Sequence, residues 1–236
     1  MLTRNTGFAL LAALLLLPIS ALATDKVPPP GLNKAQLLVF FKDHLKGVGK
    51  DSLLDYDFKS ETKDAESFTD HIEVKVTNVV DESKRDMEFN FLTGSHHINF
   101  SPAKGYTGNP VLIHFLERDI SLMTKDAGGF SGFYRNRIRD SFKQPSEIKA
   151  VKFQLNGKDL EGTEIIVTPF VGDPFAKNFK LYENKRYEFI FSDQVPGGIY
   201  RIHTQVPDAT NGSVLIDESM TFREIMNQSA KQYAGD

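Results

Sequence analysis

The chain has 236 residues, a formal net charge of −3 and no cysteine. So weak a charge argues against nucleic acid as a partner, and against a protein held on a membrane by electrostatic attraction alone. Without cysteine there is no disulfide and no lipid anchor on a thiol, so the fold must be held together by the burial of its side chains.

The N-terminus predicts a secretory signal peptide. Arg4 gives a positive start, an apolar run follows from Phe8 to Leu17, and Pro18 precedes the small residues of Ala21-Leu22-Ala23. This order is typical of a signal cleaved after Ala23. A retained membrane anchor is the alternative, but the apolar stretch is short for a bilayer span and contains a proline. We expect residues 1–23 to be removed, which leaves no integral membrane segment.

The predicted location is the periplasm of a bacterium, with secretion as the alternative. Small eukaryotic secreted domains usually rely on disulfides, and this chain has none. Removal of Arg4, the only charged residue of the signal, makes the net charge one unit more negative.

A Pro-rich leader and one helix begin the mature chain. The leader covers residues 24–31, and Asn33 is a good N-cap for a helix from about Lys34 to Lys46. Apolar residues recur along this segment at helical spacing, and Gly47 and Gly49 follow it.

From Leu53 to Phe100 the apolar period changes to two, which is typical of strands with one buried and one wet face. Three strands are predicted, around Leu54–Phe58, Ile72–Val76 and Met87–Phe91, and His97–Phe100 is a candidate fourth.

A helical pair is predicted from Asn109 to Phe142, the longest helix-period region of the mature chain. Strands resume after it. Asn156-Gly157 and Asn211-Gly212 are strong hairpin-turn signals, because a type I′ turn needs positive φ at both central residues. The tail from Glu224 to Asp236 is polar and is expected to be frayed.

These elements predict an α+β fold with a predominantly antiparallel β-sheet, an N-terminal helix and a central helical pair, because successive strands are not separated by helices. The sheet is either curved into a half-barrel or split into a two-sheet sandwich. We expect a single domain over residues 24–236. The alternative is a division near residues 144–147, with 148–223 as a β-rich half.

No pattern predicts a metal, a cofactor or a catalytic nucleophile. The six histidines lack metal-ligand spacing, and there is no nucleophile elbow or phosphate-binding glycine loop.

Two charges of the helical pair have apolar neighbours at helical spacing. Asp119 has apolar residues three, four and seven positions away, and Arg137 has three aromatic residues on its own face. By the same spacing, the wet faces hold His114, Glu117, Arg118, Ser121, Arg135 and Arg139. Because an isolated buried charge is very unfavourable, we expect Asp119 and Arg137 to form a structural ion pair. The alternative is a ligand site in which Arg137, with Tyr134, Arg135 and Asp119, binds an anionic molecule.

The predicted function is that of an exported, non-enzymatic protein of the cell envelope. It would bind a hydrophobic or amphipathic, lipid-like small molecule, or an envelope protein, on a sheet covered by the helical pair. The alternatives are a periplasmic hydrolase that uses His114, Glu117 or His203, and a structural β-domain of an envelope assembly.

Overall fold

The computed structural model describes residues 30–63 and 65–227. The predicted signal peptide, most of the Pro-rich leader and the last nine residues lie outside this range. In the part that is described, no helix is both long enough and apolar enough to cross a membrane.

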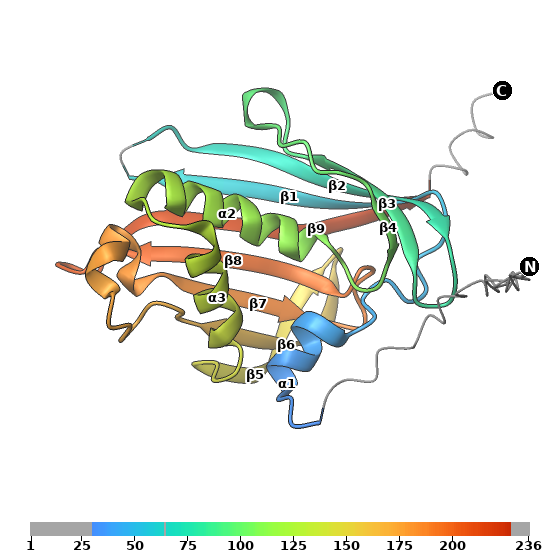
Figure 1. The fold of residues 1–236 in the computed structure, drawn as a ribbon. Helices are drawn as coiled ribbons and strands as arrows, with labels where there is room; N and C mark the ends of the chain where they lie inside the picture. Colours follow the sequence, from blue (N-terminus) through green and yellow to red (C-terminus); the bar gives the residue numbers. More distant parts are fainter. Residues whose placement is uncertain (1–29, 64, 228–236) are drawn as a thin grey trace, which may run out of the picture.

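Nine antiparallel strands form one curved, open sheet (Figure 1). Their order across the sheet is β4-β3-β2-β1-β9-β8-β7-β6-β5, so β4 and β5 are its two edges. The strands are β1 (Ser52–Thr62), β2 (Phe68–Val79), β3 (Arg85–Phe91), β4 (Ala103–Tyr106), β5 (Glu147–Leu155), β6 (Lys158–Val167), β7 (Arg186–Phe191), β8 (Ile199–Pro207) and β9 (Val214–Asn227). The predicted fold class is confirmed, in its single-sheet form.

The last strand, β9, joins two groups of strands. In the sequence, the helical pair lies between these two groups. β9 pairs with β1 from Ser52–Asn227 to Thr62–Ile216, and with β8 on its other side. The first and the second β-rich region therefore belong to one continuous sheet.

The helical pair consists of α2 (Val111–Ala127) and α3 (Ser131–Ser141), which lie across the concave face of the sheet (Figure 1). The start of α2 is fixed to the sheet by Asn109, whose side-chain amide donates to the Tyr56 hydroxyl at 2.8 Å and to the Gly197 carbonyl at 3.0 Å. Gly128 ends α2 with a φ of 78°, a conformation that glycine adopts without steric cost.

An aromatic core lies between the helices and the sheet. Phe115 of α2 packs on Phe58 of β1 with ring centroids 6.3 Å apart, and Phe142, just after α3, packs on Phe189 of β7 at 5.3 Å. Leu54, Tyr56 and Phe58 are all buried, as the period of two along this strand predicts.

Three local predictions are wrong. The first helix is shorter than expected: α1 (Lys34–Gln36) continues as a π-helix, η1 (Leu37–Phe41), and ends at Lys42, which has an extended backbone. His97–Phe100 is not a strand, although Ile98 forms an isolated bridge to Phe91, and the fourth strand is β4. Residues 224–227 extend β9 instead of fraying.

Two short 3-10 segments complete the fold. The segment η2 (Gly94–His96) lies between β3 and β4, and η3 (Ala176–Asn184) lies between β6 and β7 near the end of α2. The predicted Asn156-Gly157 hairpin turn is confirmed, with φ values of 51° and 74° at its two central residues.

Candidate functional site

A buried arginine connects α2 to the sheet. The Arg118 guanidinium donates from Nη1 to Glu218 Oε2 at 2.9 Å and from Nη2 to Oε1 at 3.0 Å, a bidentate pair between α2 and β9. The Ser60 hydroxyl donates to the same carboxylate at 2.8 Å, and the guanidinium lies 4.7 Å from the centre of the Phe58 ring. The sequence pattern placed Arg118 on the wet face of the helix, and this prediction is wrong.

The environment of Glu218 keeps its carboxyl group ionised. Burial alone would raise its pKa, but the charge and hydrogen bonds of Arg118, the charge of Lys185 and the hydrogen bond from Ser60 outweigh burial. The net result is a pKa below the usual value for glutamate.

Asp119 forms the second buried charge pair beneath α2. Lys185, next to the start of β7, donates to Asp119 Oδ1 at 2.5 Å, and the Tyr187 hydroxyl donates to Oδ2. Burial raises the pKa of Tyr187 well above its usual value, and the Asp119 charge raises it further. Tyr187 is therefore held in its neutral, proton-donating form.

The predicted pair between Asp119 and Arg137 is not formed, and each residue has another partner. Arg137 donates from Nε to Asp173 at 2.6 Å and lies over the Phe133 ring, 4.3 Å from its centre. Helical spacing identified Asp119 as buried, which is correct, but Arg137 remains 29% exposed at its side chain.

The other predicted ligand residues are not brought together. Tyr134 is buried, and its hydroxyl donates to the Gly128 carbonyl at 2.9 Å. Arg135 forms an exposed bidentate pair with Glu117 between the two helices, at 2.6 Å for both bonds. Tyr134, Arg135 and Asp119 line three different grooves. A common anion site made by Tyr134, Arg135, Arg137 and Asp119 has no support from this arrangement.

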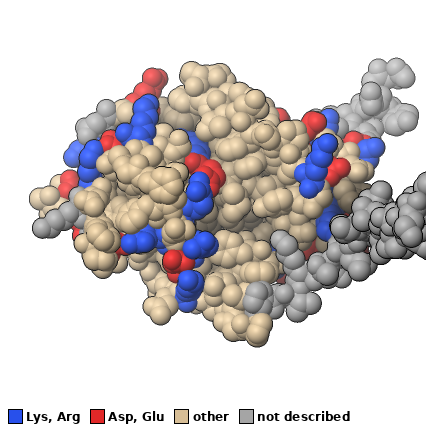
Figure 2. Space-filling model, in the orientation of Figure 1, with Lys and Arg blue, Asp and Glu red and all other residues tan. Residues whose placement is uncertain are grey.

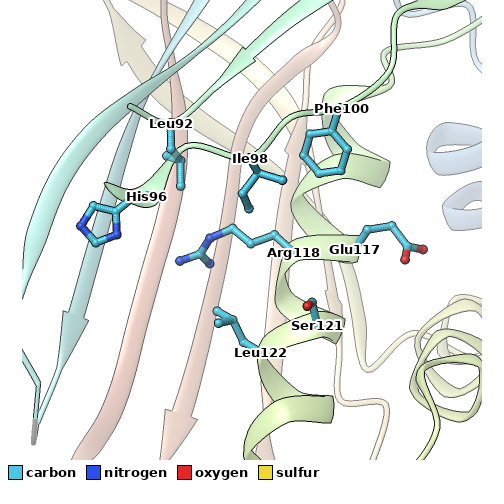
Figure 3. Close-up of a pocket in the computed structure, with 8 residues that line it drawn as sticks. All are labelled: Leu92, His96, Ile98, Phe100, Glu117, Arg118, Ser121 and Leu122. Atoms are coloured by element: carbon cyan, nitrogen blue, oxygen red, sulfur yellow. The ribbon is translucent and has the colours of Figure 1, made fainter. Parts of the chain in front are cut away.

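An amphipathic groove runs between α2 and the segment that follows β3 (Figure 3). Its volume is about 360 Å³. Figure 3 shows Leu92, Ile98 and Phe100 on one side and Leu122 of α2 on the other, with the Arg118 side chain extending between them. His96, Glu117 and Ser121 complete the lining. The groove therefore combines apolar walls with a few polar groups, as small-molecule sites commonly do.

His114 packs behind Phe100, one of the residues that line this groove. Its ring stacks on Phe100, with centroids 4.0 Å apart, and meets Phe89 edge to face at 4.3 Å. Burial lowers the His114 pKa to about 4, so the ring is neutral near pH 7. The wet-face prediction is only partly right for His114, since the side chain is half-buried among aromatic rings.

Two further grooves follow α2 towards its C-terminal end. One has a volume of about 300 Å³ and is lined by Leu122, Asp119, Lys185 and Glu218, among others, so Leu122 belongs to both this groove and the first. The next, about 660 Å³, lies at the α2–α3 turn and is mainly aromatic, with Phe130, Phe133, Phe175 and Phe179. Successive turns of α2 thus line three neighbouring grooves.

The sequence contained a signal for the partners that helical spacing missed. Glu218 is in phase with the buried Met220 and Phe222, and Lys185 is in phase with the buried Tyr187 and Phe189. A charged residue in the apolar phase of a strand is a candidate for a buried ion pair, by the argument applied to Asp119.

Metal binding has no candidate among residues 30–63 and 65–227, where no three His, Asp or Glu side chains are grouped closely enough to hold an ion.

No family model matches the chain, and no curated protein matches it either. Several solved structures are similar to it at low scores. The lipoprotein LppX of Mycobacterium tuberculosis is 11% identical, with 79% of this chain and 90% of that chain covered and a TM-score of 0.33. LprF of Mycobacterium bovis is 12% identical, with 81% and 92% covered and a TM-score of 0.33. A LolA superfamily protein of Nitrosomonas europaea is 9% identical, with 82% and 93% covered and a TM-score of 0.22. TM-scores this low support no conclusion about the function of this chain.

Proposed function

We propose that the protein is an exported, non-enzymatic binding protein of the bacterial cell envelope, which takes a hydrophobic or amphipathic small molecule in the groove between α2 and the segment after β3. The observation that carries this proposal is the lining of that groove. Leu92, Ile98, Phe100 and Leu122 provide apolar contact, and a small set of polar side chains lies among them. The signal-like N-terminus supports export.

The chemistry of the groove favours a molecule with an apolar body and a head that forms hydrogen bonds. The Arg118 charge is already balanced by Glu218, so the groove offers hydrogen-bond donors rather than an unpaired positive charge. The remaining polar groups are His96, Ser121 and Glu117. His96 and Ser121 can hydrogen-bond a hydroxyl, a carbonyl or a carboxylate, and the Glu117 carboxylate is paired with Arg135. The sheet beneath the helical pair, where the sequence placed the ligand, is occupied by core side chains, so the proposed site is instead the groove beside α2.

The test is binding of a dansyl-labelled fatty acid in vesicle-free buffer, followed by fluorescence. We expect saturable binding by the native chain and a loss of about tenfold or more in affinity for Leu122→Asp, because a carboxylate would then face the apolar wall. The control is Val80→Asp, which changes a comparably exposed apolar side chain in the β2–β3 turn (40% exposed for Leu122, 50% for Val80). Equal binding by both variants, or no saturable binding by the native chain, would disprove the site.

A further inference from the structure

The apolar tip of the molecule is formed by Phe130 and Phe175. Among the residues that the structure describes, Phe130 is the most exposed large apolar side chain, at 74%, and Phe175 is 52% exposed. They come from the turn between α2 and α3 and from the loop that leads into η3, two segments that meet at one end of the sheet (Figure 1). Large apolar side chains exposed together on a soluble fold usually mark an interaction surface.

Phe175 of the apolar tip packs on aromatic rings that connect it to the core. Phe175 meets Phe133 edge to face at 6.3 Å, and Phe133 stacks on Phe179 at 5.4 Å. Phe130 and Phe175 line the same aromatic groove of about 660 Å³. Phe179 is fully buried, which ties this cluster to the core.

Both basic and acidic side chains lie beside the tip. Lys125 and Lys180 are exposed there, and Lys180 donates to the Asp126 backbone carbonyl at the end of α2. Figure 2 shows blue Lys and Arg atoms among tan surface at this end. Asp126 and Glu183 are exposed as well, so the charge around the tip is mixed and the aromatic rings must supply most of the attraction. Aromatic rings with lysines at their margin suit the boundary between lipid headgroups and acyl chains.

We propose that the apolar tip docks on a lipid surface, with Phe130 and Phe175 inserted at the headgroup level. The grooves along α2 favour a lipid surface as the partner of the tip. The aromatic groove at the tip includes Ala127, the residue that follows Asp126 of the second groove, and Leu122 belongs to both the second groove and the site proposed for the ligand. The inference rests on the proposed function in this respect: a water-insoluble ligand is taken from a membrane, and the tip lies at the start of the groove series.

The experiment is flotation of the native chain with phosphatidylcholine vesicles and with vesicles that also contain phosphatidylglycerol. The native chain is expected to float with both, because the tip carries mixed charge. Phe130→Ser with Phe175→Ser should bind about tenfold more weakly or worse, since two exposed rings no longer enter the lipid. The control pair is Val80→Ser with Ile225→Ser, two apolar side chains that are 50% and 40% exposed and lie away from the tip, in the β2–β3 turn and near the end of β9.

The outcomes separate this inference from the proposed function. The tip variant should still bind the dansyl fatty acid in vesicle-free buffer, and Leu122→Asp should still float while losing the fatty acid. Failure of the native chain to float, or unchanged flotation of the tip variant, would overturn docking without affecting the ligand test. A Phe130-dependent dimer in light scattering would also overturn docking, because a second copy would then cover the tip.

Discussion

Arg118 and Arg135 are both arginines of the helical pair with bidentate glutamate partners, but their surroundings differ. The side chains of Arg118 and Glu218 are 9% and 5% exposed, whereas those of Arg135 and Glu117 are 49% and 33% exposed. Removing one member of a buried pair leaves an uncompensated charge, whereas an exposed pair is screened by water.

Arg118→Ala is therefore expected to lower the free energy of unfolding by about 3–5 kcal/mol. The matched variant Arg135→Ala should lower it by about 0–1 kcal/mol. Urea denaturation followed by circular dichroism measures both. The double change Arg118→Met with Glu218→Leu should recover much of the loss, since neither member of this pair is then left buried without its partner. Equal effects of the two single variants would show that the Arg118–Glu218 pair is not a desolvated one.

His44 provides a second test at the scale of one residue, through pH. It is 6% exposed, stacks on Phe191 with ring centroids 5.5 Å apart, and accepts the Asn109 backbone N–H at Nδ1. Burial lowers its pKa from 6.5 to about 4, and the nearby charges of Lys42 and Asp193 act in opposite directions. The folded protein therefore holds His44 neutral at pH values where the unfolded chain has already protonated it.

Because the unfolded state binds the proton first, stability should be unaffected by His44 above pH 6.5 and should fall as the pH drops from 6.5 towards 4. The loss attributable to His44 is about 3 kcal/mol at the acid end, since one pKa unit corresponds to about 1.4 kcal/mol. Denaturation of the native chain and of His44→Gln across this range isolates the effect, because His114 and the carboxyl groups remain in both. Parallel stability curves for the two proteins would contradict it.

At the scale of elements, the sequence was informative at one of the two local turn signals. Asn211-Gly212 lies in a longer connection between β8 and β9, and only Gly212 has a positive φ there. The Asn156-Gly157 turn needs only two residues that tolerate positive φ, and the structure has 51° and 74° there. The helical pair is predicted by its own apolar spacing. The end of the first helix could not be predicted from local spacing. The chain leaves the helix at Lys42 and buries His44 against Phe191 and Gly198, contacts that no local pattern shows.

The candidate site was predictable to a smaller extent, because its partners come from distant elements. Helical spacing predicted that Asp119 is buried, but its partner Lys185 is 66 positions away in the sequence. Likewise, Glu218 is 100 positions from its partner Arg118. Aromatic spacing also suggested a buried Arg137, although its guanidinium lies at the edge of the core over Phe133 and pairs with Asp173. A period indicates which face an element buries, while the packing of one element on another decides which charges meet.

At the scale of the whole molecule, β9 holds the two β-rich regions together. Without it, β1 to β4 would end in an unpaired edge at β1, and β5 to β8 would end in one at β8. β9 also carries Glu218, and the buried Met220 and Phe222 of the core. Its loss would therefore remove the bridge of the sheet and the partner of Arg118 at the same time.

We expect the native chain to unfold in one cooperative transition, with the same midpoint by far-UV and near-UV circular dichroism. A chain that ends at Ser213, before β9, should lose the near-UV signal and the cooperative transition, because both remaining sheets would expose apolar faces and unpaired edges. The control is a chain that ends at Asn227, which keeps the whole of β9 and should keep the cooperative transition. Two separate transitions in the native chain, or a cooperative transition in the chain that ends at Ser213, would mean that the two β-rich regions are independent domains.

A single shared transition would instead tie the grooves along α2 to the stability of the entire sheet, since α2 is anchored to β9 through Arg118 and to β7 through Asp119.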